Sequence, residues 1–122
     1  NRNLTMDPSK EEVKKPLFSL NIDSAPGPDE FTNKIFRLYW DVFPDEVTNV
    51  VDEFFNHACM PYGIISSFIA LIPKKEGAVE IKDSRLDAIE NTIPKIICKA
   101  FVTRLGDIMK EILTPNHFGF VF

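Results

Sequence analysis

Cationic side chains in the second half of the chain have the residue types and spacing that favour phosphate chemistry. The planar guanidinium of arginine can donate two parallel hydrogen bonds to phosphate oxygens, and the ammonium of lysine is a compact positive charge. Lys74 and Lys75 are adjacent, and Arg85 lies between Asp83 and Asp87 in the sequence. Taken by composition alone, the lysine pair predicts a solvated turn and the arginine a surface ion pair.

Lys95 and Lys99 are four residues apart, so they share one face of a helix if that segment is helical. Together with Arg104 they form a second candidate surface for a nucleic-acid backbone. A solvated helix face is the plainer interpretation of the same spacing.

Metal-binding and nucleophilic patterns are weak. A catalytic site with two metal ions needs clustered carboxylates, yet no two aspartates are adjacent in the chain. Cys59 and Cys98 do not form a CxxC pair, and His57 and His117 lie at unsuitable spacing for zinc. We expect two reduced, packed thiols in an intracellular protein.

The net charge of the 122 residues is −4, which argues against a free-standing nucleic-acid binder. Residues 1–60 carry 6 Lys/Arg and 11 Asp/Glu, whereas residues 61–122 carry 8 and 7. Any binding to nucleic acid must therefore come from local clusters. No apolar run reaches membrane-spanning length, so no membrane partner is expected.

Hydrophobic periodicity predicts the elements that would position these residues. After a polar tail at residues 1–7, a helix should begin near Asp7 or Ser9, where Ser9-x-x-Glu12 fits a capping box. Pro16 should kink or shorten that helix. Further helices are expected at residues 31–40, 45–59 and 94–113.

Between the last two helices the apolar run 68–72 has the character of a buried strand. The turn that follows predicts a return strand at residues 78–83 and an irregular segment at 84–91. In the loop 22–30, Asp29 is expected to stabilise a turn rather than bind a metal. The apolar tail 115–122 reads as a strand or loop that needs a neighbour.

Four sequence blocks stand in order along residues 8–122. They are Ala25-Pro-Gly-Pro-Asp29; Phe68-Ile-Ala-Leu-Ile-Pro-Lys-Lys75; Ile81-Lys-Asp-x-Arg85 with Asn91-Thr-Ile-x-Lys-Ile-Ile97 and Arg104-Leu105; and Pro115-Asn116 with Phe120-Val121. In this order they resemble the reverse transcriptases of LINE-type (non-LTR) retrotransposons, especially those abundant in plants.

The resemblance implies a partial reverse transcriptase domain over residues 8–122, comprising the fingers and the approach to the palm. The implied fold is α+β and mainly helical, with helices packed around a small β-hairpin and the palm missing. In the family the palm supplies the aspartates that hold Mg²⁺, so no cofactor is expected in this chain. RNA template and DNA primer are the implied partners, with the missing palm or another protein as further ones.

The resemblance also implies roles for individual residues. Arg85 stands where the family has an arginine near the incoming nucleotide, and Lys74 and Lys75 follow the fingers strand toward the phosphates. The full set of candidate nucleotide- or nucleic-acid-binding residues is Lys74, Lys75, Lys82, Arg85, Lys95 and Lys99.

The sequence departs from the family pattern at its most specific positions. Glu30 replaces a glycine, Ser84 a tyrosine, and Leu86 and Asp87 a Pro-Ile pair. Segment 84–90 is therefore expected to make the family's contacts poorly, as after loss of function.

Three interpretations remain open. The chain is a fragment of an RNA-directed DNA polymerase that is inactive alone, or a non-enzymatic retrotransposon remnant that binds protein or, weakly, nucleic acid. The third is an unrelated helical interaction module.

Overall fold

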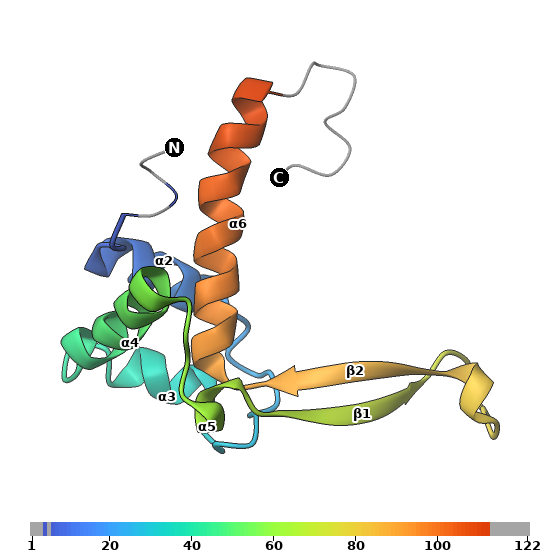
Figure 1. The fold of residues 1–122 in the computed structure, drawn as a ribbon. Coiled ribbons are helices and arrows are strands. Elements are labelled where there is room, and N and C mark those ends of the chain that lie inside the picture. The colour runs from blue at the N-terminus through green and yellow to red at the C-terminus, as the bar shows by residue number, and fades with distance from the viewer. Residues whose placement is uncertain (1–3, 5, 113–122) are drawn as a thin grey trace.

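The computed structural model describes Leu4 and residues 6–112, which form five helices, a short 3-10 turn and two strands. Their bounds are α2 (Lys10–Ser19), α3 (Asn33–Leu38), α4 (Pro44–His57), α5 (Tyr62–Ile65), β1 (Ser67–Pro73), η1 (Ile81–Asp83), β2 (Ser84–Glu90) and α6 (Thr92–Ile112). The predicted α+β class, mainly helical with one hairpin, is confirmed (Figure 1). No helix in the described part is long and apolar enough to cross a membrane.

Helix α2 begins as its sequence predicts. The Ser9 hydroxyl accepts from the Glu12 backbone N–H at 3.3 Å, and the Glu12 carboxylate accepts from the Ser9 N–H at 3.0 Å. This reciprocal capping box satisfies two amides that have no partner inside the helix. The helix runs through Pro16 and ends at Ser19, three residues later.

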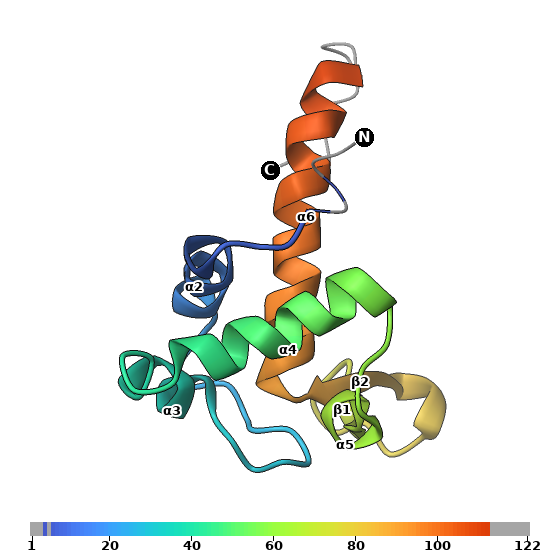
Figure 2. The same ribbon diagram turned by 60° about the vertical axis from the view of Figure 1, so that its left-hand side comes forward.

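The core lies where α2, α4 and α6 meet, and Figure 2 shows α4 crossing α6. Periodic apolar residues on each helix face inward, as expected for amphipathic helices. The buried cluster comprises Val13, Leu17, Trp40, Val47, Val51, Ile93, Ile96 and Ile97. The predicted helices 31–40, 45–59 and 94–113 are confirmed, with ends shifted by a few residues.

The hairpin formed by β1 and β2 has a different return strand from the one predicted. β1 pairs antiparallel with β2 from Ser67 opposite Glu90 to Pro73 opposite Ser84. The predicted return strand at 78–83 is wrong, and the supposedly irregular residues 84–90 form β2. A ten-residue connection replaces the expected tight turn, and the Lys74 N–H closes it by donating to the Asp83 carbonyl at 2.8 Å.

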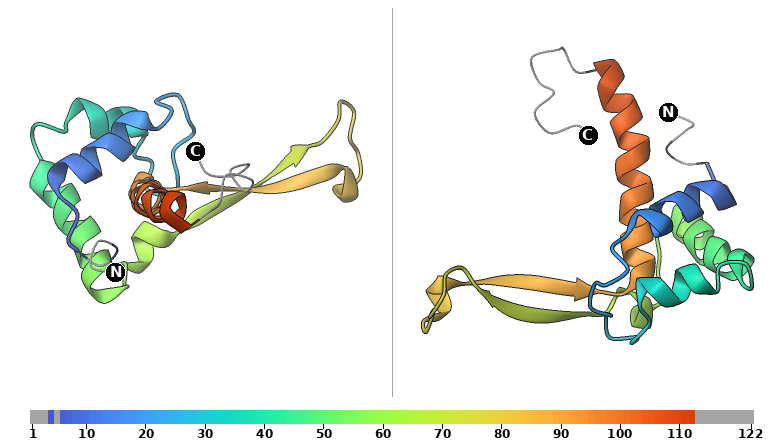
Figure 3. Two further views of the ribbon diagram at one scale, coloured as in Figure 1. Left: turned by 90° about the horizontal axis from the view of Figure 1, so that it is seen from above. Right: turned by 180° about the vertical axis from the view of Figure 1, so that it is seen from behind.

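β1 was expected to be buried, and this prediction is also wrong. Phe68, Ile69 and Leu71 are 54%, 74% and 56% exposed. The hairpin extends away from the helices rather than lying among them (Figure 3), so neither face of its single layer is covered by a helix along most of its length. The predicted apolar tail 115–122 lies outside the described residues.

Candidate nucleic-acid interface

Four of the six predicted cations meet at the end of the hairpin that is farthest from the helices. We call residues 74–85 the hairpin tip (Figure 1). The connection between the strands carries Lys74, Lys75 and Lys82, and Arg85 is the second residue of β2. The Lys74 ammonium donates to the Lys82 carbonyl at 3.2 Å, which holds the two ends of the connection together.

Each of the other three tip cations has an acidic neighbour. Lys75 pairs with Asp83 at 3.0 Å, Lys82 with Glu80 at 2.7 Å and Arg85 with Asp87 at 3.5 Å. Residues 74–87 carry four cationic and four acidic side chains, so their formal charge is zero. Exposed pairs of this kind contribute only about 0–1 kcal/mol, so a phosphate could displace the carboxylates at little cost.

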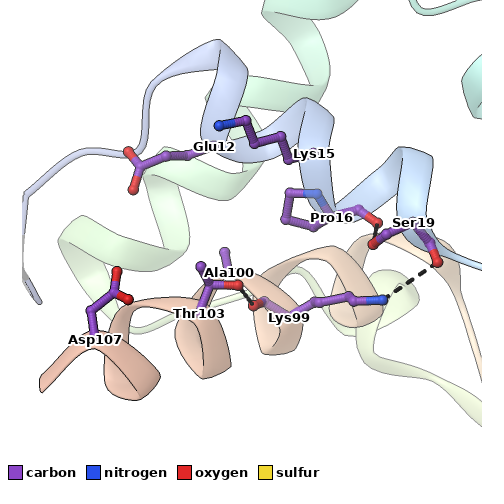
Figure 4. A pocket seen from close by; sticks show the side chains of 8 residues that line it. All are labelled: Glu12, Lys15, Pro16, Ser19, Lys99, Ala100, Thr103 and Asp107. Carbon is purple, nitrogen blue, oxygen red and sulfur yellow. Dashed lines mark hydrogen bonds between the residues drawn. The ribbon is translucent and has the colours of Figure 1, made fainter. Parts of the chain in front are cut away.

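Lys95 and Lys99 lie on α6, apart from the hairpin tip. The Lys99 ammonium donates to the Ser19 carbonyl at 3.4 Å, at the C-terminal end of α2 (Figure 4). A cation at this place also complements the negative end of the helix dipole. Lys99 borders a pocket of about 440 Å³ whose other lining residues are Glu12, Lys15, Pro16, Ser19, Ala100, Thr103 and Asp107.

Arg104 does not join these lysines as a surface cation. Its guanidinium forks onto the Glu12 carboxylate at 3.1 and 3.3 Å, donates to the Met6 carbonyl at 2.7 Å and lies 4.7 Å from the centre of the Phe55 ring. Only 9% of its side chain is exposed. The hydrogen bonds from Arg104 lower the pKa of Glu12. Arg104 therefore fastens α6 to the start of α2 and is not available to a phosphate backbone.

The base of the hairpin is held by a buried amide that the sequence did not single out. Asn91, which follows β2 directly, is fully buried. Its side-chain oxygen accepts from the Asp29 N–H at 3.1 Å, and its amide nitrogen donates to the carbonyls of Gly63 and Ile64 at 3.0 and 2.9 Å. One side chain thus joins the loop before α3, the short helix α5 that precedes β1, and the junction of β2 with α6.

A second buried pair supports the same junction. The Thr92 hydroxyl donates to the Asn33 side-chain oxygen at 2.8 Å, and the Asn33 amide donates to the Asn21 carbonyl and the Ser24 hydroxyl at 2.7 and 2.8 Å. Asn33 and Thr92 are both almost fully buried. Asn33 of α3 therefore links these loop groups to Thr92, the first residue of α6.

Glycine is required where the loop touches this junction. A Cβ added to Gly27 would lie 2.3 Å from the Asn91 side-chain oxygen and 2.6 Å from the carbonyl carbon of Glu90. The expected turn at Asp29 is confirmed, because its carboxylate accepts from the Phe31 N–H at 2.9 Å. Asp29 of the first motif block and Asn91 of the third, 62 residues apart in sequence, thus meet in space.

The described residues do not offer a metal site of their own. No group of three or more His, Cys, Asp or Glu side chains within Leu4 and residues 6–112 could hold a metal ion. Cys59 and Cys98 are free, but both are exposed rather than packed as expected.

Comparison with known proteins gives one distant similarity. The chain is 27% identical over 107 residues to the "Transposon TX1 uncharacterized 149 kDa protein" of Xenopus laevis. The aligned segment covers 88% of this chain and 8% of the relative, so the chain spans less than a tenth of that protein's length. No protein-family model matches the chain. Over most of its own length the chain is thus distantly similar to a transposon protein.

Proposed function

We propose that this chain is the fingers part of a LINE-type reverse transcriptase, of a kind similar to those of plants. The observation that carries the proposal is the meeting of separate motif blocks at Asn91. The Ala25–Asp29 loop, the base of the hairpin and the start of α6 share its three hydrogen bonds.

In this proposal the hairpin tip contacts phosphates of the incoming nucleotide or of the template and primer. Fixed cations beside a transferring phosphoryl group stabilise the charge that develops on it. Lys74, Lys75 and Arg85 are brought together by the register of β1 with β2. Lys82 adds a fourth cation, whereas Lys95 and Lys99 would belong to a separate contact along α6.

Nucleotidyl transfer itself would depend on carboxylates from a palm domain. Two-metal transfer uses carboxylates that activate the primer hydroxyl and stabilise the leaving pyrophosphate. With no adjacent aspartates in the chain, we propose that it does not extend a primer by itself. Primer extension by the purified chain, with template, nucleotides and Mg²⁺ present, would contradict this.

The binding proposal is tested by fluorescence anisotropy with a labelled RNA–DNA hybrid at low salt. We expect weak, salt-dependent binding, because phosphate contacts release counterions. Changing Lys74, Lys75, Lys82 and Arg85 together to Ala should abolish it. The matched control removes the same charge from four exposed lysines elsewhere, namely Lys10, Lys15, Lys34 and Lys110.

Two outcomes would remove the phosphate role. One is no binding by the unchanged chain at low salt, and the other is equal loss of affinity in both quadruple variants. Equal loss would indicate attraction by overall charge rather than by the hairpin tip.

A non-enzymatic remnant that binds protein is the second candidate function. The exposed apolar side chains of the hairpin favour it, since Ile69 and Leu86 are 74% and 70% exposed. Exposed apolar surface of this kind often marks a site of association.

A further inference from the structure

The two strands of the hairpin present different outer edges. The sheet has only these two strands, so among the described residues each strand pairs along one edge only. An edge without a neighbour offers its backbone N–H and C=O groups to another strand. β2 carries Arg85, Asp87 and Glu90, whereas the seven residues of β1 carry no charge.

Charged side chains on an edge strand are a common protection against pairing with another chain. β1 lacks this protection, and three of its apolar side chains, Phe68, Ile69 and Leu71, are more than half exposed. Its proline, Pro73, lies at the last position of the strand and leaves the preceding N–H groups available. The outer edge of β1 is therefore the more receptive one.

The sequence of β1 is complementary to itself in the antiparallel direction. Pairing centred on Ala70 places Phe68 opposite Ile72 of a second copy and Ile69 opposite Leu71. Two small alanine side chains meet at the centre, and no charge opposes another. Apolar cross-strand pairs of this kind stabilise a sheet.

The charges of β2 restrict its pairing with itself to particular registers. Pairing of β2 centred on Asp87 places two aspartates directly opposite each other. Like charges in that position destabilise a strand pair. β1 carries no charge, so none of its registers is opposed in this way.

We propose that two copies of this chain pair through the outer edges of their β1 strands. The product is a four-stranded antiparallel sheet in the order β2–β1–β1–β2, with a twofold axis at Ala70. Such an interface uses the same surface on both copies and closes at two. Dimerisation would also stabilise the hairpin, because a two-stranded ribbon alone is marginally stable in water. The inference does not rest on the proposed function.

The decisive variant is Ala70→Lys. Within the hairpin Ala70 is the register partner of Asp87, so the introduced ammonium meets an opposite charge and the monomer fold is retained. In the dimer two ammonium groups face each other at the axis. Sedimentation of the full chain over a wide concentration range should show a monomer–dimer equilibrium for the unchanged chain. Dimer affinity should fall at least about tenfold in the variant.

Ala88→Lys on β2 is the matched control, since it adds the same charge to the other strand of the hairpin. Its dimer affinity should stay within a few-fold of the unchanged chain. Circular dichroism of both variants checks that the helices persist. Hydrogen exchange gives an independent reading, because amides of β1 should gain protection with concentration while those of β2 should not.

A chain that stays monomeric at every concentration overturns the proposal. So does a dimer that survives Ala70→Lys. Loss of that dimer in Leu105→Lys would assign it instead to α6, where Val102, Leu105 and Met109 form an exposed apolar stripe.

Discussion

The side-chain oxygen of Asn91 accepts a hydrogen bond from the backbone N–H of Asp29 at 3.1 Å, across 62 residues of sequence. This bond joins the loop before α3 to the point where β2 ends and α6 begins. The amide nitrogen of the same side chain donates to the carbonyls of Gly63 and Ile64 in α5, the helix before β1. One buried side chain therefore links the loop before α3, α5 and the end of β2.

Replacing Asn91 by Ala should destabilise the fold by about 2 kcal/mol, because two carbonyls and one N–H lose their partner in a partly buried site. Chemical denaturation followed by circular dichroism measures the change. Asn49→Ala, at an exposed position on α4, should change stability by no more than about 0.5 kcal/mol. A loss as small in the Asn91 variant as in this control would contradict the anchoring role.

Glu30→Gly should stabilise the protein. Glu30 has a φ of 63°, a left-handed conformation in which a Cβ crowds the backbone. Removing the Cβ relieves that crowding, while the added freedom of the unfolded chain offsets part of the gain, which leaves about 0.5–1 kcal/mol. The melting temperature should rise by roughly 2–6 °C.

Glu30→Ala is the control for that experiment, because it removes the charge and keeps the Cβ. It should leave the melting temperature close to that of the unchanged chain. An equal rise in both variants would assign the effect to charge rather than to the backbone.

Glu12 should make stability depend on pH in the acid range. Hydrogen bonds from Arg104 lower the pKa of Glu12 below 4.5 in the folded protein. A group with a depressed folded pKa contributes stability that is present above its unfolded pKa and lost as the pH falls through its folded pKa. Glu12→Gln should cost about 1 kcal/mol at neutral pH, a figure reduced because the carboxylate is half exposed.

The gap in stability between Glu12→Gln and the unchanged chain should therefore close as the pH drops below about 4.5. Denaturation midpoints measured across that window test this. Asp107→Asn serves as the comparison, since its pair with Lys110 joins two side chains that are each more than half exposed. A gap that is constant with pH would show that Glu12 acts by packing rather than by its charge.

Local signals in the sequence predicted much of this fold. The Ser9 capping box and the helical periodicity of residues 45–59 depend on neighbours within a few positions, so they could be recognised without a structure. The turn at Asp29 is equally local. These elements form because propensity and burial favour the same local structure.

The hairpin was harder to predict because its partner decides its register. The charged residues of β2 led to the prediction of an irregular segment where the structure has a strand. The apolar residues of β1 led to the prediction of a buried strand, although no other layer of the fold covers it. The candidate site shows the same limit. Lys99 and Arg104 have partners on α2 that are 80 and 92 residues away in sequence. The residues that neighbour Lys99 and Arg104 in sequence do not indicate these partners.

Asp52 should weaken the fold at neutral pH and less so in acid. One of its carboxylate oxygens is shielded from solvent and has no hydrogen-bond partner among the described residues. Burial, followed by the charge of Asp7, raises the pKa of Asp52. The folded state therefore holds the proton more tightly than the unfolded state, and stability falls as the pH rises through the window between the two pKa values.

Asp52→Asn should gain roughly 0.5–1 kcal/mol at neutral pH, at the low end for a partly buried group without a partner. The gain should vanish at pH values below the unfolded pKa. Glu53→Gln, on the exposed side of the same helix, should show no such gain, and denaturation of both variants at neutral and acid pH separates the two cases.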